Sequence, residues 1–235
     1  MTARHRCDIY LAQTASLRSA HLALLDAAER ARAAGYLRTE DRDRFALGAV
    51  LLRAVASRRL GSTPVSLTVE RGCERCGRQH GRPRLPQAPG LHASVSHSGA
   101  VVAVALTGAG AVGVDVEAMS AGRAHADELA GVVCSGTERG EVRHARDFCV
   151  YWTRKEAVLK ATGEGLRRPL TEVHVSPPRA APRLLALAGS QPACQLADLP
   201  IGPGYQGAVA VLTDMQVECV TTDAGALLQA LAAVG

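Results

Sequence analysis

The chain has 235 residues, of which 47% are hydrophobic and 21% are charged, and it carries a formal net charge of +5. This composition is typical of a globular protein with room for a sizeable core, and it excludes an intrinsically disordered chain. No stretch of about 18 residues is apolar and uncharged enough to span a membrane, so we expect no membrane segment. The positive charge indicates an acidic partner without identifying it.

Cysteine usage and the first residues of the chain indicate its compartment. The seven cysteines show none of the spacing of a disulfide scaffold, and their odd number suits a reducing environment. Residues 1–6 are followed by no long apolar run of the kind found in a secretory signal. We therefore expect a cytoplasmic protein, and we expect it to be a monomer.

A loop rich in glycine and arginine contains Cys73, Cys76 and His80. A structural zinc ion needs four ligands, but only these three lie close together, and the alternative is a set of buried or solvated thiols. If zinc were bound, the surrounding arginines would form a zinc knuckle that binds nucleic acid in a salt-sensitive way. This second hypothesis leaves the acidic residues described below unexplained, and aromatic residues for base stacking make up only 3% of the chain.

An acidic strand is predicted at residues 111–117, where valines occupy alternate positions. Asp115 and Glu117 then share one face, about 6.6 Å apart along the strand, while Val114 and Val116 lie on the other face. Two neighbouring carboxylates repel each other unless a cation lies between them. Such oxygen ligands suit Mg²⁺, which completes its shell with water and phosphate oxygens. The alternative is a solvent-facing edge strand with ordinary charges.

A helix is predicted at residues 147–162, ending at Gly163, and it contains both lysines of the chain, Lys155 and Lys160. The chain has 27 lysines and arginines, and the other 25 are arginine. These two positions therefore favour a compact ammonium group whose pKa is easily shifted. Four side chains lie along one helix face: Phe148, Trp152, Glu156 and Lys160. The alternative is a surface Glu–Lys pair worth about 0.3 kcal/mol, and the aromatic residues on the same face argue against it.

Three segments recur in the same order, which indicates two copies of one α+β unit. Their offsets are 103 to 108 residues, and the matching positions are Asp8–Ala12 with Gly113–Glu117, Phe45 with Phe148, and Gly99–Thr107 with Gly207–Thr213. Each copy consists of a strand, a helix and a hairpin of strands. The first copy has Tyr10 and Ala12 at the positions of Asp115 and Glu117, so the chain can build one metal site. Chance similarity between segments rich in alanine and valine is the alternative.

The strand and the helix together resemble the two signature motifs of the 4′-phosphopantetheinyl transferases. The first motif ends at Glu117, and the second, Trp-x-x-Lys-Glu-Ala-x-x-Lys, places Glu156 39 residues later. Three upstream segments agree with the same family: the G-[KR]-P element at Gly81–Pro83, the S-x-S-H-S element at Ser94–Ser98, and the N-terminal helix of the longer single-chain (Sfp-like) type at Arg42–Arg53. The resemblance covers about residues 29–175.

The resemblance implies an α+β fold made of two similar halves related by pseudo-twofold symmetry. We place the halves at residues 1–109, which would contribute to coenzyme binding, and 110–235, which would carry the metal site. The implied activity is that of a holo-acyl-carrier-protein synthase. Such an enzyme uses Mg²⁺, with Mn²⁺ as the alternative, to move 4′-phosphopantetheine from coenzyme A to a serine of an apo acyl or peptidyl carrier protein, and it releases adenosine 3′,5′-bisphosphate. The sequence leaves open whether the carrier serves fatty acid, polyketide or nonribosomal peptide biosynthesis.

The resemblance also implies a role for each site residue. The metal ligands would be Asp115, Glu117 and Glu156. Glu156, or a metal-bound water beside it, would take the serine proton, and Lys160 would stabilise charge on the phosphoryl and leaving groups. Coenzyme binding would involve seven residues: Arg44, Arg82, Ser96, His97, Asp115, Lys155 and Lys160. Of these, Arg44, Arg82 and His97 would hold the 3′-phosphate and adenine end, where the planar fork of arginine is an advantage. Neither Ser96 nor Ser98 is expected to act as a nucleophile, because no Asp–His relay follows in hydrolase order.

Overall fold

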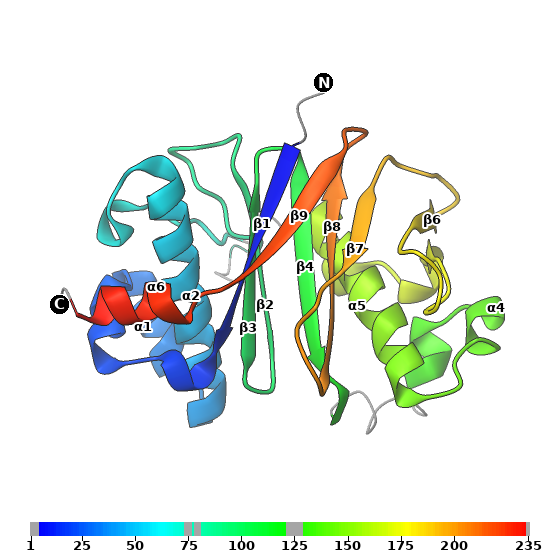
Figure 1. Cartoon of the computed structure of the whole chain (residues 1–235), viewed down its shortest axis with the longest axis horizontal. Coiled ribbons are helices and arrows are strands. Elements are labelled where there is room, and N and C mark those ends of the chain that lie inside the picture. Colours follow the sequence, from blue (N-terminus) through cyan, green and yellow to red (C-terminus); the bar gives the residue numbers. More distant parts are fainter. Residues whose placement is uncertain (1–4, 73–76, 78–80, 121–128, 234–235) are drawn as a thin grey trace.

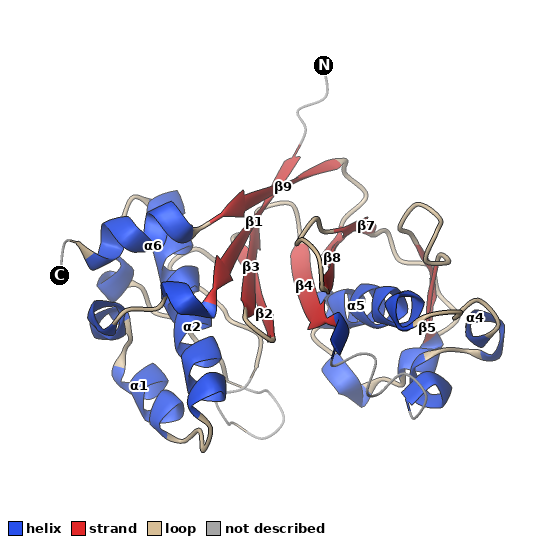
Figure 2. Ribbon diagram, turned by 60° about the horizontal axis from the view of Figure 1, so that its bottom comes forward, coloured by secondary structure: helices blue, strands red, loops and turns tan. Residues whose placement is uncertain are grey.

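The structure, a computed structural model, describes residues 5–72, 77, 81–120 and 129–233 of the chain (Figure 1). Two β-sheets stand back to back in the middle of the molecule, and helices cover the outer face of each sheet (Figures 1 and 2). The predicted α+β class is therefore confirmed.

The first sheet has the strand order β2-β3-β1-β9. Its strands are β1 (His5–Gln13), β2 (His92–Ser98), β3 (Val101–Thr107) and β9 (Val217–Asp223). Strand β3 runs antiparallel to β2 and β1, whereas β1 and β9 are parallel. Three helices cover the outer face: α1 (Ala27–Ala34), α2 (Thr39–Leu60) and α6 (Gly225–Ala232). Helix α2 is buried from Phe45 to Ser57, so it forms the centre of the core on this side.

The second sheet is antiparallel and has the order β4-β8-β7. Its strands are β4 (Ala111–Ala118), β7 (Gln195–Asp198) and β8 (Tyr205–Leu212), and helix α5 (Ala145–Thr162) covers its outer face. Smaller elements surround α5, namely α4 (Gly136–Arg139), β5 (Val173–Val175) and β6 (Leu184–Leu187). Short 3₁₀ turns occur at Thr14–Ser16, Ser19–Leu24, Pro64–Ser66, Gly165–Arg167 and Leu170–Glu172.

The inner faces of the two sheets form a separate apolar layer. Side chains from both sheets meet in it, including Ile9, Ala103, Val114, Val116 and Val209. The alternation of β4 sends Val114 and Val116 into this layer, as the sequence predicts, and leaves Asp115 and Glu117 on the side of α5. Removing this apolar surface from water stabilises the stacked sheets.

Helix α5 begins and ends at residues that explain its bounds. The carboxylate of Asp147 accepts hydrogen bonds from the backbone N–H groups of Arg143 and His144, which satisfies donors at the helix start. Gly163 follows the last turn with a φ of 79°, a left-handed conformation that glycine adopts at low cost. The predicted helix 147–162 is thus confirmed, with a start two residues earlier.

The two halves repeat the same pairing of elements. In each half a strand precedes a long helix and pairs antiparallel with the last strand of a hairpin, β1 with β3 and β4 with β8. Strand β9 and helix α6 lie within residues 110–235 but join the sheet and the core of the first half. The division into halves at residues 109 and 110 remains a proposal.

Two further expectations concern the whole chain. Within the described ranges, no helix is long and apolar enough to cross a membrane. Cys73, Cys76 and His80, the ligands of the alternative zinc knuckle, lie outside the described residues.

Candidate active site

The two sheets meet along β2 and β4, where serine side chains join them. The alternation of β2 places Ser94, Ser96 and Ser98 on one face. Their hydroxyl oxygens accept hydrogen bonds from the backbone N–H groups of Val114, Val116 and Ala118 at 3.0, 3.3 and 3.0 Å, respectively. Because β4 is the edge strand of its sheet, these hydroxyls satisfy donors that would otherwise lack a partner. The acidic face of β4 is thereby held in register with β2.

A charged cluster lies beside this seam and is formed by β2, β4 and α5. The ammonium of Lys160 donates hydrogen bonds to Asp115 Oδ1 at 2.6 Å and to Ser96 Oγ at 2.9 Å. The Ser96 hydroxyl in turn donates to Asp115 Oδ1 at 2.9 Å. Asp115 is buried, whereas the Lys160 side chain retains 28% of its exposure, so the ammonium can reach a bound molecule.

Glu156 lies one helical turn before Lys160 and is buried beside the same cluster. Burial, together with the negative charge of Asp115, raises the pKa of Glu156 to about 7. Among the described residues, neither Glu156 Oε1 nor Asp115 Oδ2 has a hydrogen-bond partner, although both atoms are buried. Two neighbouring carboxylates therefore each keep one oxygen available for a cation or a donor.

The close approach of α5 to β4 depends on Gly113. A Cβ atom at this position would lie 2.0 Å from the carbonyl oxygen of Ala157, 2.5 Å from the backbone nitrogen of Ala161 and 2.8 Å from the Cβ atom of Lys160. Only glycine therefore allows the helix to rest directly on the strand. Gly113 shares a strand face with Asp115, so the same contact sets the distance between the carboxylate of β4 and the charged groups of α5.

Two adjoining cavities open over these groups. The smaller one, of about 270 Å³, is lined by Ser96, Asp115, Glu117, Trp152, Glu156 and Lys160, among others. The larger one, of about 600 Å³, shares Val95, His97, Lys160 and Leu166 with it. Basic side chains gather around the larger cavity: Arg32, Arg71, Arg82 and Arg167. The site thus combines a carboxylate pocket with a basic pocket, an arrangement that suits a ligand with several phosphates.

The predicted coenzyme-binding residues of the N-terminal half lie at different distances from this site. Arg82 lines the larger cavity and donates a hydrogen bond to the carbonyl oxygen of Ala161, 2.9 Å away. His97 lines both cavities, and its pKa is lowered by partial desolvation and by the charges of Lys160 and Arg44. Arg44 is close enough to influence His97, but it bonds to Gly99 and Asp41 and does not line either cavity.

The residues present fit a divalent cation in part. In the described portion of the chain, no three Asp, Glu, His or Cys side chains converge closely enough to form a metal centre by themselves. The two buried oxygens without partners, on Asp115 and Glu156, are nevertheless the hard ligands that Mg²⁺ prefers, and Glu117 lines the same pocket. Mg²⁺ commonly uses one or two carboxylates and takes its other ligands from water and substrate phosphates, so a preformed three-residue cluster is not required.

Comparisons with known proteins point to one family. Residues 111–210, which contain β4 and α5, match the model of the 4′-phosphopantetheinyl transferase superfamily. The chain is 28% identical to the 4′-phosphopantetheinyl transferase Sfp of Bacillus subtilis strain 168, over 77% of this chain and 79% of the relative. It is 27% identical to another 4′-phosphopantetheinyl transferase of Bacillus subtilis, over 66% of this chain and 67% of the relative. It is 33% identical to a putative 4′-phosphopantetheinyl transferase of Synechocystis, over 64% and 62%.

The chain is similar to 4′-phosphopantetheinyl transferases over most of its length, and residues 111–210 match the model of their superfamily. The predicted resemblance to the longer, Sfp-like type of this family is confirmed. Of the nine site residues predicted for this transferase, seven line the two cavities: Arg82, Ser96, His97, Asp115, Glu117, Glu156 and Lys160.

The other two, Arg44 and Lys155, line neither cavity, and Lys155 is buried in different surroundings. Its side chain is fully buried, and its ammonium donates to Glu138 at 2.5 Å and to the carbonyl oxygens of Val133 and Leu170 at 2.8 and 3.1 Å. Burial lowers the pKa of Lys155, and the neighbouring Glu138 opposes this shift. In this structure Lys155 therefore ties α5 to the segments around it and does not reach the cavities.

The sequence did not predict a role in this site for three arginines that line the larger cavity, namely Arg32, Arg71 and Arg167. Arg71 is buried, and its Nε has no hydrogen-bond partner among the described residues. The sequence places Arg71 in a run of basic residues, which is the only local signal for it. That signal does not distinguish a ligand-binding arginine from a solvated one.

Proposed function

We propose that this transferase takes 4′-phosphopantetheine from coenzyme A and attaches it to a serine hydroxyl of an apo acyl or peptidyl carrier protein. The observation that carries the proposal is the pair of buried carboxylate oxygens without partners on Asp115 and Glu156, beside the Lys160 ammonium. This pair opens into the basic cavity described above. The combination suits a pyrophosphate ligand that brings a divalent cation with it.

The basic cavity would hold the phosphates and adenine end of coenzyme A. Arg71 supports this role, because its buried Nε lacks a hydrogen-bond partner among the described residues and its guanidinium forms only a long ion pair with Glu29, at 3.9 Å. Desolvation lowers the pKa of this guanidinium, so a bound phosphate would relieve an unfavourable state. Arg82 is fixed to the end of α5, which orients its fork toward the same space. His97 would contact the phosphates from the neighbouring strand.

Asp115 and Glu156, with Glu117 beside them, would hold the divalent cation. Bound Mg²⁺ would neutralise and orient the pyrophosphate of the coenzyme. Lys160 would exchange part of its contact with Asp115 for a phosphoryl oxygen, which its partial exposure allows. The negative charges of the carboxylates and phosphates would then be offset by the cation and Lys160 at the seam between the two sheets.

The reaction would be a displacement at phosphorus. The serine oxygen of the carrier forms a new P–O bond to the phosphorus that bears pantetheine. The bond from that phosphorus to the bridging oxygen of the pyrophosphate breaks, and the bridging oxygen leaves with adenosine 3′,5′-bisphosphate. Glu156, which lines the carboxylate pocket beside Asp115, would accept the serine proton. Lys160 would stabilise the charge on adenosine 3′,5′-bisphosphate as it leaves.

The charge of the chain agrees with a carrier protein as partner. Carrier proteins are generally acidic, and a net charge of +5 on the enzyme favours encounter with an acidic protein. The nucleic-acid hypothesis has less support, since it gives no role to the carboxylates at the seam, and the similarity of this chain to the transferases does not favour it.

A thermal-shift experiment tests the ligand class. Coenzyme A with Mg²⁺ should raise the melting temperature, because a ligand that binds only the folded state stabilises it. Single-stranded and duplex nucleic acid should leave the melting temperature unchanged. A shift with nucleic acid that is lost in Cys73→Ser, with none from coenzyme A, would favour the zinc-knuckle hypothesis and contradict the proposal.

A further inference from the structure

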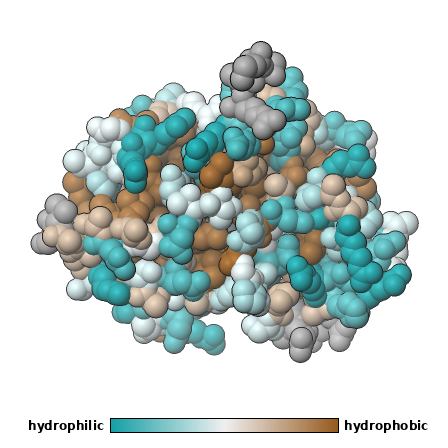
Figure 3. Space-filling model, viewed as in Figure 1, coloured by the Kyte–Doolittle hydropathy of each residue, from teal (hydrophilic) through white to brown (hydrophobic). Residues whose placement is uncertain are grey.

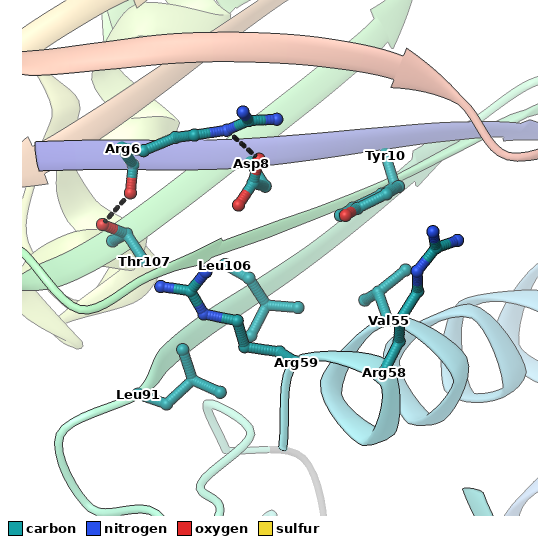
Figure 4. A pocket seen from close by; sticks show the side chains of 9 residues that line it. All are labelled: Arg6, Asp8, Tyr10, Val55, Arg58, Arg59, Leu91, Leu106 and Thr107. Carbon is teal, nitrogen blue, oxygen red and sulfur yellow. Dashed lines mark hydrogen bonds and ion pairs between the residues drawn. The ribbon is translucent and has the colours of Figure 1, made fainter. Parts of the chain in front are cut away.

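A separate cavity of about 290 Å³ lies between β1 and the C-terminal part of α2 (Figure 4). Strand β1 contributes Arg6, Asp8 and Tyr10, helix α2 contributes Val55, Arg58 and Arg59, and the remaining lining residues are Leu91, Leu106 and Thr107. None of these residues lines the candidate active site. The cavity therefore needs an explanation of its own.

The internal repeat explains why this space is open. The alignment of the two halves places Asp8 at the position of Gly113 and Tyr10 at the position of Asp115. In the second half, Gly113 lets α5 rest directly on β4. In the first half, the Asp8 and Tyr10 side chains project from the strand, and α2 packs mainly on β3 and β2 instead of β1. The cavity thus lies in the first half at the place where, in the second half, α5 contacts β4.

The charges around this cavity are not balanced. Arg6 is paired with Asp8, with an Nε–Oδ1 distance of 2.5 Å. Arg58 and Arg59 have no hydrogen-bond or ion-pair partner among the described residues, although both line the same concave surface. Figure 4 shows Arg59 projecting from the end of α2 toward the strand side of the cavity. Three guanidinium groups face one carboxylate, so the cavity has an excess of two positive charges.

The other side of the cavity is apolar. Val55 and Leu106 are buried at its floor, and Leu91 and the ring of Tyr10 extend this surface. Over the region where α2 approaches β1, hydrophobic atoms are exposed between hydrophilic side chains (Figure 3). The volume lies near the lower limit for small-molecule sites, about 300 Å³. A fitting ligand is small, carries two negative charges and has a compact apolar body.

We infer that this cavity binds a phosphomonoester dianion, with the phosphate held by Arg59 and Arg6, the charge of Arg58 adding to the attraction, and the body packed on Leu106 and Val55. Arginine forks match phosphate oxygens in pairs, and the two excess charges match a phosphomonoester above its second pKa of about 6. Asp8 competes with the ligand for Arg6.

The site is tested by titrating phenyl phosphate into the full chain at about pH 7.5 and measuring the amide chemical shifts. We expect saturable shifts at Tyr10, Leu106 and Thr107, and weaker binding of benzoate, which carries one charge. The Arg58→Gln/Arg59→Gln double variant should weaken phenyl phosphate binding by at least about tenfold, since it removes a guanidinium that bonds to the phosphate and a second that adds positive charge to the cavity. Both arginines are exposed, so the variant should fold normally.

Two further variants separate this site from general attraction to a basic protein. Asp8→Asn should tighten binding because it frees Arg6, whereas Arg179→Gln, at an exposed turn remote in sequence from the cavity, should change nothing. An unchanged titration in the double variant would overturn the inference. Shifts confined to Ser96, His97 and Lys160 would also overturn it, because the phosphate would then occupy the candidate active site alone.

Discussion

At the scale of single residues, Glu156 is a buried carboxyl of the candidate site whose ionised form is disfavoured. It is buried beside Asp115, and burial with this like charge raises its pKa to about 7. When a carboxyl has a higher pKa in the folded than in the unfolded protein, its ionisation lowers the free energy of unfolding. The metal-free protein should therefore become less stable as the pH rises from about 4.5 through 7, as far as this group contributes.

Glu156→Gln should stabilise the metal-free protein at pH 8 while abolishing transfer. The amide keeps the shape of the side chain but removes the buried charge, and the gain should be on the order of 1–3 kcal/mol. The gain should vanish below about pH 4.5, where the native carboxyl is protonated in both states, and it should shrink when Mg²⁺ is added. Thermal denaturation across this pH range checks it. Equal stability of variant and wild type at pH 8 would show that the ionised form of Glu156 is not disfavoured.

Lys160→Arg should lower the rate of carrier modification by about 10²-fold or more, although it keeps the charge. The wider guanidinium cannot reproduce the contacts of the ammonium with Asp115 Oδ1 and Ser96 Oγ, and a misplacement of about 1 Å can have an effect of this size. Arg179→Lys, at an exposed turn, is the matched control and should be silent. Rates measured at saturating coenzyme, together with melting temperatures, separate catalysis from folding. Full activity in Lys160→Arg would mean that the compact ammonium is not required.

At the scale of elements, the site depends on the direct contact between α5 and β4. Glu156 and Lys160 come from the helix and Asp115 from the strand, so any shift of one element against the other changes all their distances. Gly113 is the point of closest approach. The serine bonds between β2 and β4 fix the other side of the same strand.

Gly113→Ala should lower both stability and activity. The new Cβ would lie 2.0 Å from the Ala157 carbonyl oxygen, so α5 must move away from β4 at a cost of about 1–3 kcal/mol. Urea denaturation and the transfer rate check this expectation. Gly136→Ala, where a Cβ meets nothing within 4 Å, is the control. Wild-type stability and activity in Gly113→Ala would show that the helix does not need this contact.

At the scale of the whole molecule, the sequence predicts the parts of the fold that depend on local periodicity. The alternating valines define β4, and the i, i+4 spacing defines the face of α5 that carries Glu156 and Lys160. The parallel pairing of β9 with β1 joins residues about 210 positions apart, for which no local pattern exists. The seam formed by serine hydroxyls is equally invisible, since serines on alternate positions look like an ordinary polar strand face.

The same limit applies to the site. Lys155 and Lys160 look alike in the sequence, yet Lys155 is enclosed by Val133, Glu138 and Leu170, which lie on other segments. Its surroundings depend on tertiary packing that a helix pattern cannot specify. The carboxylates are predictable because their alternation on a strand and their spacing to the helix motif are both written in the chain.

The most direct test of the central claim is the mass of a carrier protein. Apo acyl carrier and apo peptidyl carrier proteins are incubated with the enzyme, coenzyme A and Mg²⁺, and their masses are followed over time. We predict an increase equal to one phosphopantetheine on the carrier serine with the wild-type chain, and none with folded Asp115→Ala or with EDTA. If the wild-type enzyme modified neither kind of carrier, the proposed activity would be contradicted. Normal modification by folded Asp115→Ala would contradict the proposed site.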